Sequence, residues 1–386
     1  ATPAHPFFLA VLSGNLEVIK GLVEKNKSLL EVTSKNGGNC AHTAALAGHV
    51  HILEWLKSIG FDVTKKTEHG ITSLQLATVF SKDNVVKWLV ENGCDPNEKD
   101  NNGSTCVHQA ATRDKIDLLE WLVNNGGRLD EVDDTGATCA HYAAKEGKTD
   151  NLIWLSERCD ITKPTKNGTS CIHLASSEGH LNTVEWLVEN NYECKSSTGK
   201  SALHLAAQYG HLDLLDWFVN RNYDLKETDD NGYSCVHYAT QNGQVDTLEW
   251  LCKHGCEDEL YRKLDNLQGF TCFHIASING KDNIVDWFFN VRGYEVNEDA
   301  HLCLRLATFH GKHSVVKCLV NKGCDPNHKI SGATCLHVAV CRGYNDLVEW
   351  LVNKGGDLTI EDRRGNSCFQ LAEKANHKQL AEWIQS

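Results

Sequence analysis

The chain has 386 residues, and its 38 Lys and Arg against 51 Asp and Glu give a net charge of −13. This charge argues against a nucleic-acid-binding protein, which must neutralise phosphates with basic side chains, and it is compatible with a basic protein partner. No apolar run is long enough to span a membrane and no signal peptide precedes the first segment, so direct membrane insertion is not expected.

The cysteines and the missing methionine bear on where the protein works. The 17 cysteines are an odd number in a long chain, which does not fit a secreted disulfide scaffold. They are interpreted as reduced thiols in a cytoplasmic protein, with the nucleus as an alternative. The sequence contains no methionine, even at its first position, which suggests a fragment of a longer protein.

A short motif of Thr or Ser, Cys, any residue and His recurs from the start of the chain to its end, for example TCVH at 105–108 and TCAH at 138–141. The last position of this motif is called the anchor. The anchors define twelve units, repeats 1 to 12, with a period near 33 residues. In chain order they are Phe8, His42, Gln75, His108, His141, His173, His204, His237, His274, Arg305, His337 and Gln370.

Each repeat has the same layout around its anchor. A short Ala-containing helix is predicted at the anchor, followed by a second helix with apolar residues at helical spacing, such as Val184 and Leu187. Five residues before the anchor stands a glycine, which a tight turn with positive φ needs. These turn glycines are Gly37, Gly70, Gly103, Gly136, Gly168, Gly199, Gly232, Gly269, Gly332 and Gly365.

A tryptophan stands thirteen residues after the anchor in ten repeats, and every Trp of the chain is used this way. The fixed place of this Trp ladder on the apolar stripe of the second helix predicts core packing rather than an aromatic ligand cage. Its members are Trp55, Trp88, Trp121, Trp154, Trp186, Trp217, Trp250, Trp287, Trp350 and Trp383.

Turn, short helix, second helix and loop at this period resemble the ankyrin repeat family. The family motif T-P-L-H appears here mostly as T-C-x-H, and its loop motif survives at 93–97 and 323–327. The resemblance implies an all-α fold, an ankyrin-repeat solenoid of stacked helix-turn-helix units with projecting β-turn loops. It implies a single domain over 1–386 with about 12 repeats, capped by degenerate repeats at 1–33 and 360–386.

Several motifs could carry chemistry, and each has a simpler interpretation. A Cys-x-His pair in most repeats could bind zinc, but a structural zinc site needs four ligands in one cluster, whereas these pairs are spread along the stack. The resemblance implies that the His hydrogen-bonds near the turn, and a buried Cys behaves as a small hydrophobic residue. No nucleophile stands out, and no phosphate loop or metalloprotease motif occurs. No catalytic, cofactor-binding or metal-binding residue is predicted, and the protein is not expected to be an enzyme.

The partner site is predicted from turn-tip and first-helix positions that the family leaves free to vary. Most of these positions are small or polar, and Phe80 is an isolated exception. Apolar exceptions in four successive repeats mark an interaction patch, namely Tyr209, Tyr233, Phe270, Ile278 and Phe309. Residues 221–300 contain 15 acidic and 7 basic residues, which gives −8. The turn-tip acids predicted to rim the patch are Asp230, Glu298 and Asp299.

The same region holds the two largest departures from the repeat. The gap between His237 and His274 is 37 residues, with an insertion around 257–264, and repeat 10 has Ala300 in place of its turn glycine and Arg305 as its anchor. Irregular loops on a regular scaffold often carry function. Simple degeneration of the repeat is the alternative.

The main hypothesis is a non-enzymatic protein–protein interaction scaffold. Its concave face would bind a basic, partly apolar segment of another protein around repeats 7 to 10. The alternative is the ankyrin-repeat portion of a larger protein, such as the cytosolic region of an ion channel or an adaptor of a ubiquitin ligase, which the missing methionine favours. An enzyme is the third hypothesis, and no motif supports it.

Overall fold

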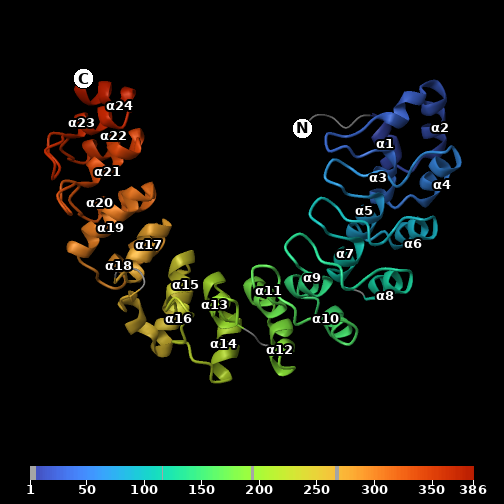
Figure 1. The fold of residues 1–386 in the computed structure, drawn as a ribbon, viewed down its shortest axis with the longest axis horizontal. Helices are drawn as coiled ribbons and strands as arrows, with labels where there is room; N and C mark the ends of the chain where they lie inside the picture. Colours follow the sequence, from blue (N-terminus) through green and yellow to red (C-terminus); the bar gives the residue numbers. More distant parts are fainter. Residues whose placement is uncertain (1–5, 115, 193–194, 266–268) are drawn as a thin grey trace. The chain divides into compact units, whose positions relative to one another are not determined.

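The computed structural model describes residues 6–114, 116–192, 195–265 and 269–386. Contacts divide the chain into two compact units, residues 1–197 and 198–386, and each unit contains six helix pairs (Figure 1). The described residues form 24 α-helices and no β-strand. The predicted all-α repeat fold is therefore confirmed.

Unit 1 holds repeats 1 to 6, and each repeat supplies a first and a second helix. These are α1 (Pro6–Leu12), α2 (Leu16–Lys25), the 3₁₀ helix η1 (Lys27–Glu31), α3 (Cys40–Ala47), α4 (Val50–Ser58), α5 (Ser73–Val79), α6 (Asp83–Glu91), α7 (Cys106–Ala111), α8 (Asp117–Asn124), α9 (Cys139–Lys145), α10 (Thr149–Ser156), α11 (Cys171–Glu178) and α12 (Leu181–Glu189).

Unit 2 holds repeats 7 to 12 and includes two short additional turns, η2 and η3, after its fourth helix. Its elements are α13 (Ala202–Tyr209), α14 (Leu212–Asn220), α15 (Cys235–Asn242), α16 (Val245–Leu251), η2 (Cys252–Cys256), η3 (Glu257–Leu260), α17 (Cys272–Asn279), α18 (Asp282–Asn290), α19 (Glu298–Phe309), α20 (His313–Asn321), α21 (Cys335–Arg342), α22 (Asn345–Asn353), α23 (Cys368–Lys374) and α24 (Lys378–Gln385).

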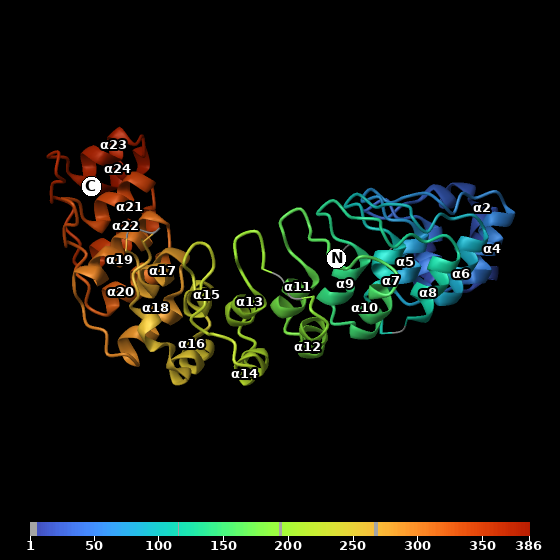
Figure 2. The same ribbon diagram turned by 60° about the horizontal axis from the view of Figure 1, so that its bottom comes forward.

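Within each unit the first helices, which carry odd numbers, form one continuous row. Each packs on the next, α1 on α3 through to α11 in unit 1 and α13 on α15 through to α23 in unit 2. Figures 1 and 2 show the second helices as a separate row in each unit. Residues at equivalent positions of successive first helices therefore share one surface.

The recurring motif starts each first helix and links it to the next repeat. The backbone N–H of Thr105, the N-cap of α7, donates to Nδ1 of His108 at 3.2 Å. Because Nδ1 accepts this bond, the ring proton lies on Nε2, which donates to the carbonyl of Ala137 in repeat 5 at 3.2 Å. Burial lowers the pKa of His108, so the ring stays neutral. The anchor histidine is structural, as the family resemblance implied.

The turns that precede the first helices are also linked from repeat to repeat. All ten predicted turn glycines have positive φ, and a Cβ on Gly70 would lie 2.8 Å from the backbone N of Asn101 in the next turn. In unit 1 each turn tip donates a backbone N–H to the previous tip. These bonds are Glu68 to Asn36 (3.0 Å), Asn101 to His69 (3.0 Å), Asp134 to Asn102 (2.9 Å) and Lys166 to Thr135 (2.9 Å).

The core of each repeat is aliphatic, and the Trp ladder lies at its edge. In α12, Val184 and Leu187 are fully buried, whereas Trp186 is half-buried. Only Trp287 is buried, and Trp383 is exposed. The prediction that the whole ladder belongs to the core is therefore wrong. The apolar stripe of the second helix is narrow, and its centre is occupied by the aliphatic residues on either side of the Trp.

Cations cover several rings of the Trp ladder. The guanidinium of Arg158 lies 4.2 Å from the ring centroid of Trp154, and that of Arg221 lies 4.1 Å from that of Trp217. A cation over the face of an indole is a favourable contact, and it shields the ring from water. The exposed face of the ladder is thus largely satisfied within the chain.

The cysteines pack as small apolar residues. Sixteen are described, all as free thiols, and Cys194 lies outside the described residues. The thiol of the buried Cys106 donates to the carbonyl of Pro96 at 3.0 Å, and burial raises the pKa of Cys40 to about 12. In the described part of the chain no three His, Cys, Asp or Glu side chains gather as metal ligands. Nor does any described helix have the length and apolar character needed to cross a membrane.

Candidate protein-binding surface

Three of the predicted partner-binding residues lie at the ends of first helices in unit 2. Tyr209 ends α13, Ile278 lies near the end of α17, and Phe309 ends α19. Tyr209 is 46% exposed and Phe309 49% exposed, while Ile278 is half-buried. Because α13, α15, α17 and α19 pack in succession, the three residues belong to one row. The structure therefore brings them together on one surface.

This row ends at a cation that the sequence analysis missed. The guanidinium of Arg342, the last residue of α21, lies 4.0 Å from the ring centroid of Phe309. Arg342 occupies a variable position of repeat 11, five residues after its anchor, but it is not one of the apolar exceptions from which the patch was predicted. Its charge was the available signal.

The other two predicted aromatic residues lie in turns and pack on their own anchors. The ring of Tyr233 lies 5.6 Å from that of His237, edge to face. The ring of Phe270 stacks on that of His274 at 5.0 Å, with an interplanar angle of 4°. Both aromatic side chains are half-buried. The expectation that no packing role explains them is therefore wrong.

The anchors under these two rings differ from the others. Nε2 of His42 and His204 reaches a carbonyl of the next repeat at 3.1 and 2.9 Å. Nε2 of His237 and of His274 is buried without a hydrogen-bond partner among the described residues. His141 and His337 are intermediate, because carbonyls of their next repeats still act on them, although more weakly. The aromatic rings thus cover the two anchors whose link to the next repeat is lost.

Each lost link has a local cause. Repeat 9 begins with the insertion, which lengthens the segment between His237 and the turn glycine Gly269. Repeat 10 has no turn at the equivalent position, because α19 begins at Glu298 and runs through it. Arg305, the unusual anchor of repeat 10, restores the pattern: its guanidinium donates to the carbonyl of Ile330 in repeat 11 at 3.0 Å.

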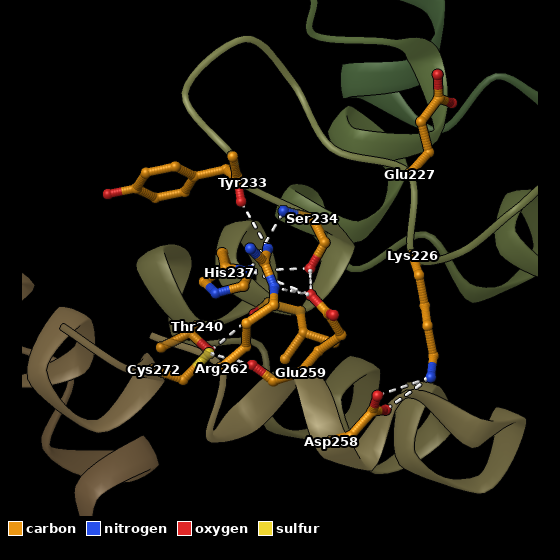
Figure 3. Close-up of polar contacts among 12 residues, drawn as sticks. Lys226, Glu227, Tyr233, Ser234, His237, Thr240, Asp258, Glu259, Arg262 and Cys272 are labelled. Carbon is orange, nitrogen blue, oxygen red and sulfur yellow. Dashed lines mark hydrogen bonds and ion pairs between the residues drawn. The ribbon is translucent and has the colours of Figure 1, made fainter. Parts of the chain in front are cut away.

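The insertion packs on unit 2 through the buried Glu259, Leu260 and Leu264, and it brings a charged group under the turn of repeat 8. Figure 3 shows Glu259, Arg262 and Ser234 meeting beside His237. The carboxylate of Glu259 accepts hydrogen bonds from the hydroxyl of Ser234 and from Nε of Arg262, both at 2.8 Å. Arg262 also donates to the carbonyl of Gly232 at 2.6 Å. Leu260 and Leu264 are fully buried, so the insertion is a packed part of unit 2.

This network keeps the neighbouring anchor neutral. Burial, together with the positive charge of Arg262, lowers the pKa of His237 to about 3. Nearby, the exposed ion pair of Lys226 and Asp258, 2.7 Å apart, connects the insertion to the loop that precedes α15 (Figure 3). These contacts join the insertion to the turn of repeat 8 and to the loop that precedes α15.

The predicted acidic rim is only partly correct. Asp230 is an exposed turn tip, as predicted, and its N–H donates to the carbonyl of Thr198 at 3.0 Å. Glu298 and Asp299 are exposed but lie in the first turn of α19, not in a turn tip. The helix forms there because the position of the turn glycine is Ala300, whose N–H is capped by the side chain of Asn297 at 3.0 Å. Acids in a first helical turn are favourable.

A lysine shares the turn position of Tyr233 and Phe270. Lys200 occupies it in repeat 7, and its ammonium lies 4.1 Å from the ring centroid of Tyr238. Burial lowers the pKa of Lys200 to about 8. Lys200 escaped the sequence analysis for the same reason as Arg342, because only apolar residues were sought.

The sequence was compared with family models and with curated proteins. The model of three ankyrin repeats matches six overlapping segments, 7–100, 81–165, 151–229, 203–300, 273–362 and 301–385. No curated protein matches the chain. Ankyrin repeats are generally protein–protein interaction modules, and ankyrin-repeat proteins are typically non-enzymatic. Since the matches run from residue 7 to residue 385, the chain belongs to the ankyrin repeat family.

Proposed function

We propose that the chain is a non-enzymatic scaffold that binds a basic, partly apolar segment of another protein in the cytoplasm or the nucleus. The binding site is the surface formed by the first-helix ends and turns of repeats 7 to 10, called the unit 2 surface. Its residues are Tyr209, Asp230, Tyr233, Phe270, Ile278, Glu298, Asp299 and Phe309.

The exposure of Tyr209 and Phe309 is the observation that carries this proposal. Both are large side chains at helix ends, where the repeat needs no apolar residue, yet about half of each is open to water. A buried aromatic anchor supplies much of the energy of an interface. Covering both rings, with the half-buried Ile278 between their helices, gives a partner an apolar strip to bind.

Charge selects the kind of partner. Asp230, Glu298 and Asp299 are exposed, and the region 221–300 has a net charge of −8. The carboxylate of Glu298 has a histidine, His328, at 3.1 Å and is otherwise open to solvent. Acidic groups around an apolar strip accelerate association with a basic segment and disfavour an acidic one. The free thiols of the described cysteines support a reducing compartment.

Tyr233 and Phe270 have a double role in this proposal. Each presents one edge to solvent and packs its other side on an anchor histidine. Their removal would weaken binding and also disturb the turn, so they are poor test positions. Tyr209 and Phe309 are better, because their removal leaves the described packing of the anchors unchanged.

The test is selection of random peptides of about 16 residues, displayed on phage, against the full chain. We expect enriched peptides that combine Lys or Arg with aromatic or aliphatic residues. Their affinity for the Tyr209→Ala/Phe309→Ala variant should fall by about tenfold or more. Tyr261→Ala is the matched control, because Tyr261 is equally exposed at 47% but follows η3 and lies outside the unit 2 surface. Basic peptides that bind the double variant as tightly as the native chain would refute the site.

A further inference from the structure

A second exposed apolar row lies on the first helices of unit 1. Leu9 is 54% exposed and Leu12 is also exposed, both on α1, while Val79 is 52% exposed at the end of α5 and Phe80, directly after it, is 47% exposed. The sequence analysis treated Phe80 as isolated. In the structure it belongs to a group of four large apolar side chains.

These four side chains share one continuous surface. Helix α1 packs on α3, and α3 packs on α5. Between the two outer helices, α3 has the half-buried Leu46 and Ala47 at the positions equivalent to Val79 and Phe80. The half-buried Thr43 takes the position equivalent to Leu9, so the row is mainly apolar across α3. Figure 1 shows α1, α3 and α5 in succession.

Packing within the unit does not explain the row. On α1 the residues Phe7, Phe8 and Val11 are buried and form its inward side, while Leu9 and Leu12 lie on the other side. The same division holds on α5, where Leu74 and Ala77 are buried. Contiguous exposed apolar side chains of this kind mark interaction sites.

The charge around the row is opposite to that of the unit 2 surface. Helices α1, α3, α5 and α7 contain no Asp, Glu, Lys or Arg. The nearest cation is Lys82, two residues after Phe80, which forms no ion pair among the described residues. The next is Arg113, whose guanidinium is held by Asp83 at 2.6 Å. The edge of the row, as far as the structure describes it, therefore carries one cation without an ion pair, Lys82, beside the neutral pair of Arg113 and Asp83.

Size and backbone chemistry limit the occupant. Three packed helices with axes about 8–10 Å apart present a row of about 20 Å, the length of about 13 residues of α-helix. The surface consists of helix ends and offers no open strand edge to an extended peptide. A helix, whose backbone groups are already paired, fits such a surface best.

We propose that Leu9, Leu12, Val79 and Phe80, with Lys82 at their edge, form a second docking site, the unit 1 surface. Its occupant is a short amphipathic helix of another protein that carries an acidic residue beside its apolar face. This site is separate from the unit 2 surface and takes a partner of the opposite charge. One chain can thereby hold an acidic and a basic segment at once.

The experiment uses the same phage-displayed peptides of about 16 residues and the full chain. A second class of enriched peptides should have apolar residues at helical spacing and a net negative charge. Their affinity should fall by about tenfold or more for Val79→Asp/Phe80→Asp. In selections against Lys82→Glu, the class should lose its acidic residues.

Two matched variants isolate the site. Val132→Asp places one such carboxylate on an exposed valine of unit 1 that lies in a loop outside the first helices, and should leave binding unchanged. Tyr209→Ala/Phe309→Ala should also bind the acidic peptides normally, so failure of the unit 2 surface and failure of the unit 1 surface can be told apart. Circular dichroism at rising temperature verifies that each variant folds.

Three results would overturn the proposal. The first is the absence of an acidic, helix-forming class among the enriched peptides. The second is a class that binds Val79→Asp/Phe80→Asp as tightly as the native chain. The third is a native chain that dimerises in sedimentation while Val79→Asp/Phe80→Asp stays monomeric, which would make a second copy of the chain the occupant.

Discussion

The turns of unit 1 and those of unit 2 are built from the same motif but are linked differently. In unit 1 backbone hydrogen bonds join one turn tip to the next from Asn36 to Lys166, whereas the described residues of unit 2 contain one such bond, from Asp230 to Thr198. After it come the insertion and the helical start of repeat 10, where side chains such as Glu259 and Arg305 make the connections instead. The stack thus tolerates the loss of backbone links between turns where side-chain contacts replace them.

Acidification should cause the largest loss of stability, because it protonates the anchor histidines of both units. Burial lowers the pKa of seven anchor histidines below the ordinary value of about 6.5. Below that value the unfolded chain binds more protons, so stability is full above about pH 6.5 and falls as the pH decreases. Each anchor histidine lowers the free energy of unfolding by up to about 1.4 kcal/mol for each pH unit of acidification.

Urea unfolding at several pH values between 7.5 and 5 measures this effect. The variant His108→Gln should show a smaller loss on acidification, since an amide does not titrate there. A chain equally stable at pH 7.5 and at pH 5 would contradict the neutral anchors. Because the pKa of His237 is lowered to about 3, its share of the loss should continue to lower pH than that of the other anchors.

The next largest effect tests the replacement contacts of unit 2. Glu259→Ala removes a buried carboxylate, and with it the ion-pair partner of Arg262 and one hydrogen-bond partner of Ser234, which should cost about 3 kcal/mol. Arg262 is partly exposed and can reach water, so the cost should not exceed this value. Hydrogen exchange should accelerate in α15 and α17, the helices that contact η3. Asp258→Ala, which breaks the exposed neighbouring pair, is the control and should change nothing measurable.

The anchors offer a direct comparison of linked and unlinked junctions. His108→Ala removes a helix cap and a bond to Ala137, while His237→Ala removes a cap alone. The first should therefore be more destabilising by about 1 kcal/mol, the value of one hydrogen bond. His108→Gln should recover most of the loss, because Gln75 makes both contacts in repeat 3, with Thr72 at 2.9 Å and with Ser104 at 2.7 Å. Equal losses of stability in the two variants would contradict the absence of a hydrogen bond from His237 to the described residues of repeat 9.

The last pair of variants separates the two kinds of aromatic residue in the unit 2 surface, and Tyr209→Ala should have the smallest effect on stability. Tyr233→Ala exposes His237 and should cost about 1–2 kcal/mol, whereas Tyr209→Ala should change stability by less than about 0.5 kcal/mol. Thermal unfolding of the two variants side by side measures the difference. If neither substitution changes the stability, the packing of Tyr233 on His237 does not stabilise the fold.

The sequence was sufficient to predict the fold because nearly every repeat carries the same cap, turn and helix signals. Thr105 and His108 predict a capped helix, and Gly70 predicts a turn with positive φ. The exceptions depend on neighbours in space. Glu298 lies in a helix because the position of the turn glycine is Ala300, and Trp186 lies at the edge of the core because its aliphatic neighbours fill the centre. The inward burial of Glu259 could not be read from a chain segment that looks like a polar loop.

The site residues divide in the same way, into those with a local sequence signal and those that depend on neighbouring repeats. Tyr209 and Phe309 were found because a large apolar residue at a variable position is visible in the sequence itself. The packing of Phe270 on His274 was not found, because it depends on what the next repeat fails to supply. The unit 1 surface was missed since Leu9 and Leu12 fall in a degenerate repeat whose exposed side could not be assigned.

The missing link at His274 affects how unit 2 unfolds. In a linear array the free energy is a sum over repeats and over the interfaces between neighbours, so a weaker interface becomes the boundary at which one part can melt while the other persists. The junctions of repeats 8 and 9 and of repeats 9 and 10 both lack the anchor bond among the described residues. The first has the Glu259 and Arg262 contacts in its place, so the boundary lies between repeats 9 and 10. A partner that spans Tyr209 to Phe309 crosses it. Binding would then couple the two sides, and part of its free energy would appear as cooperativity of unfolding.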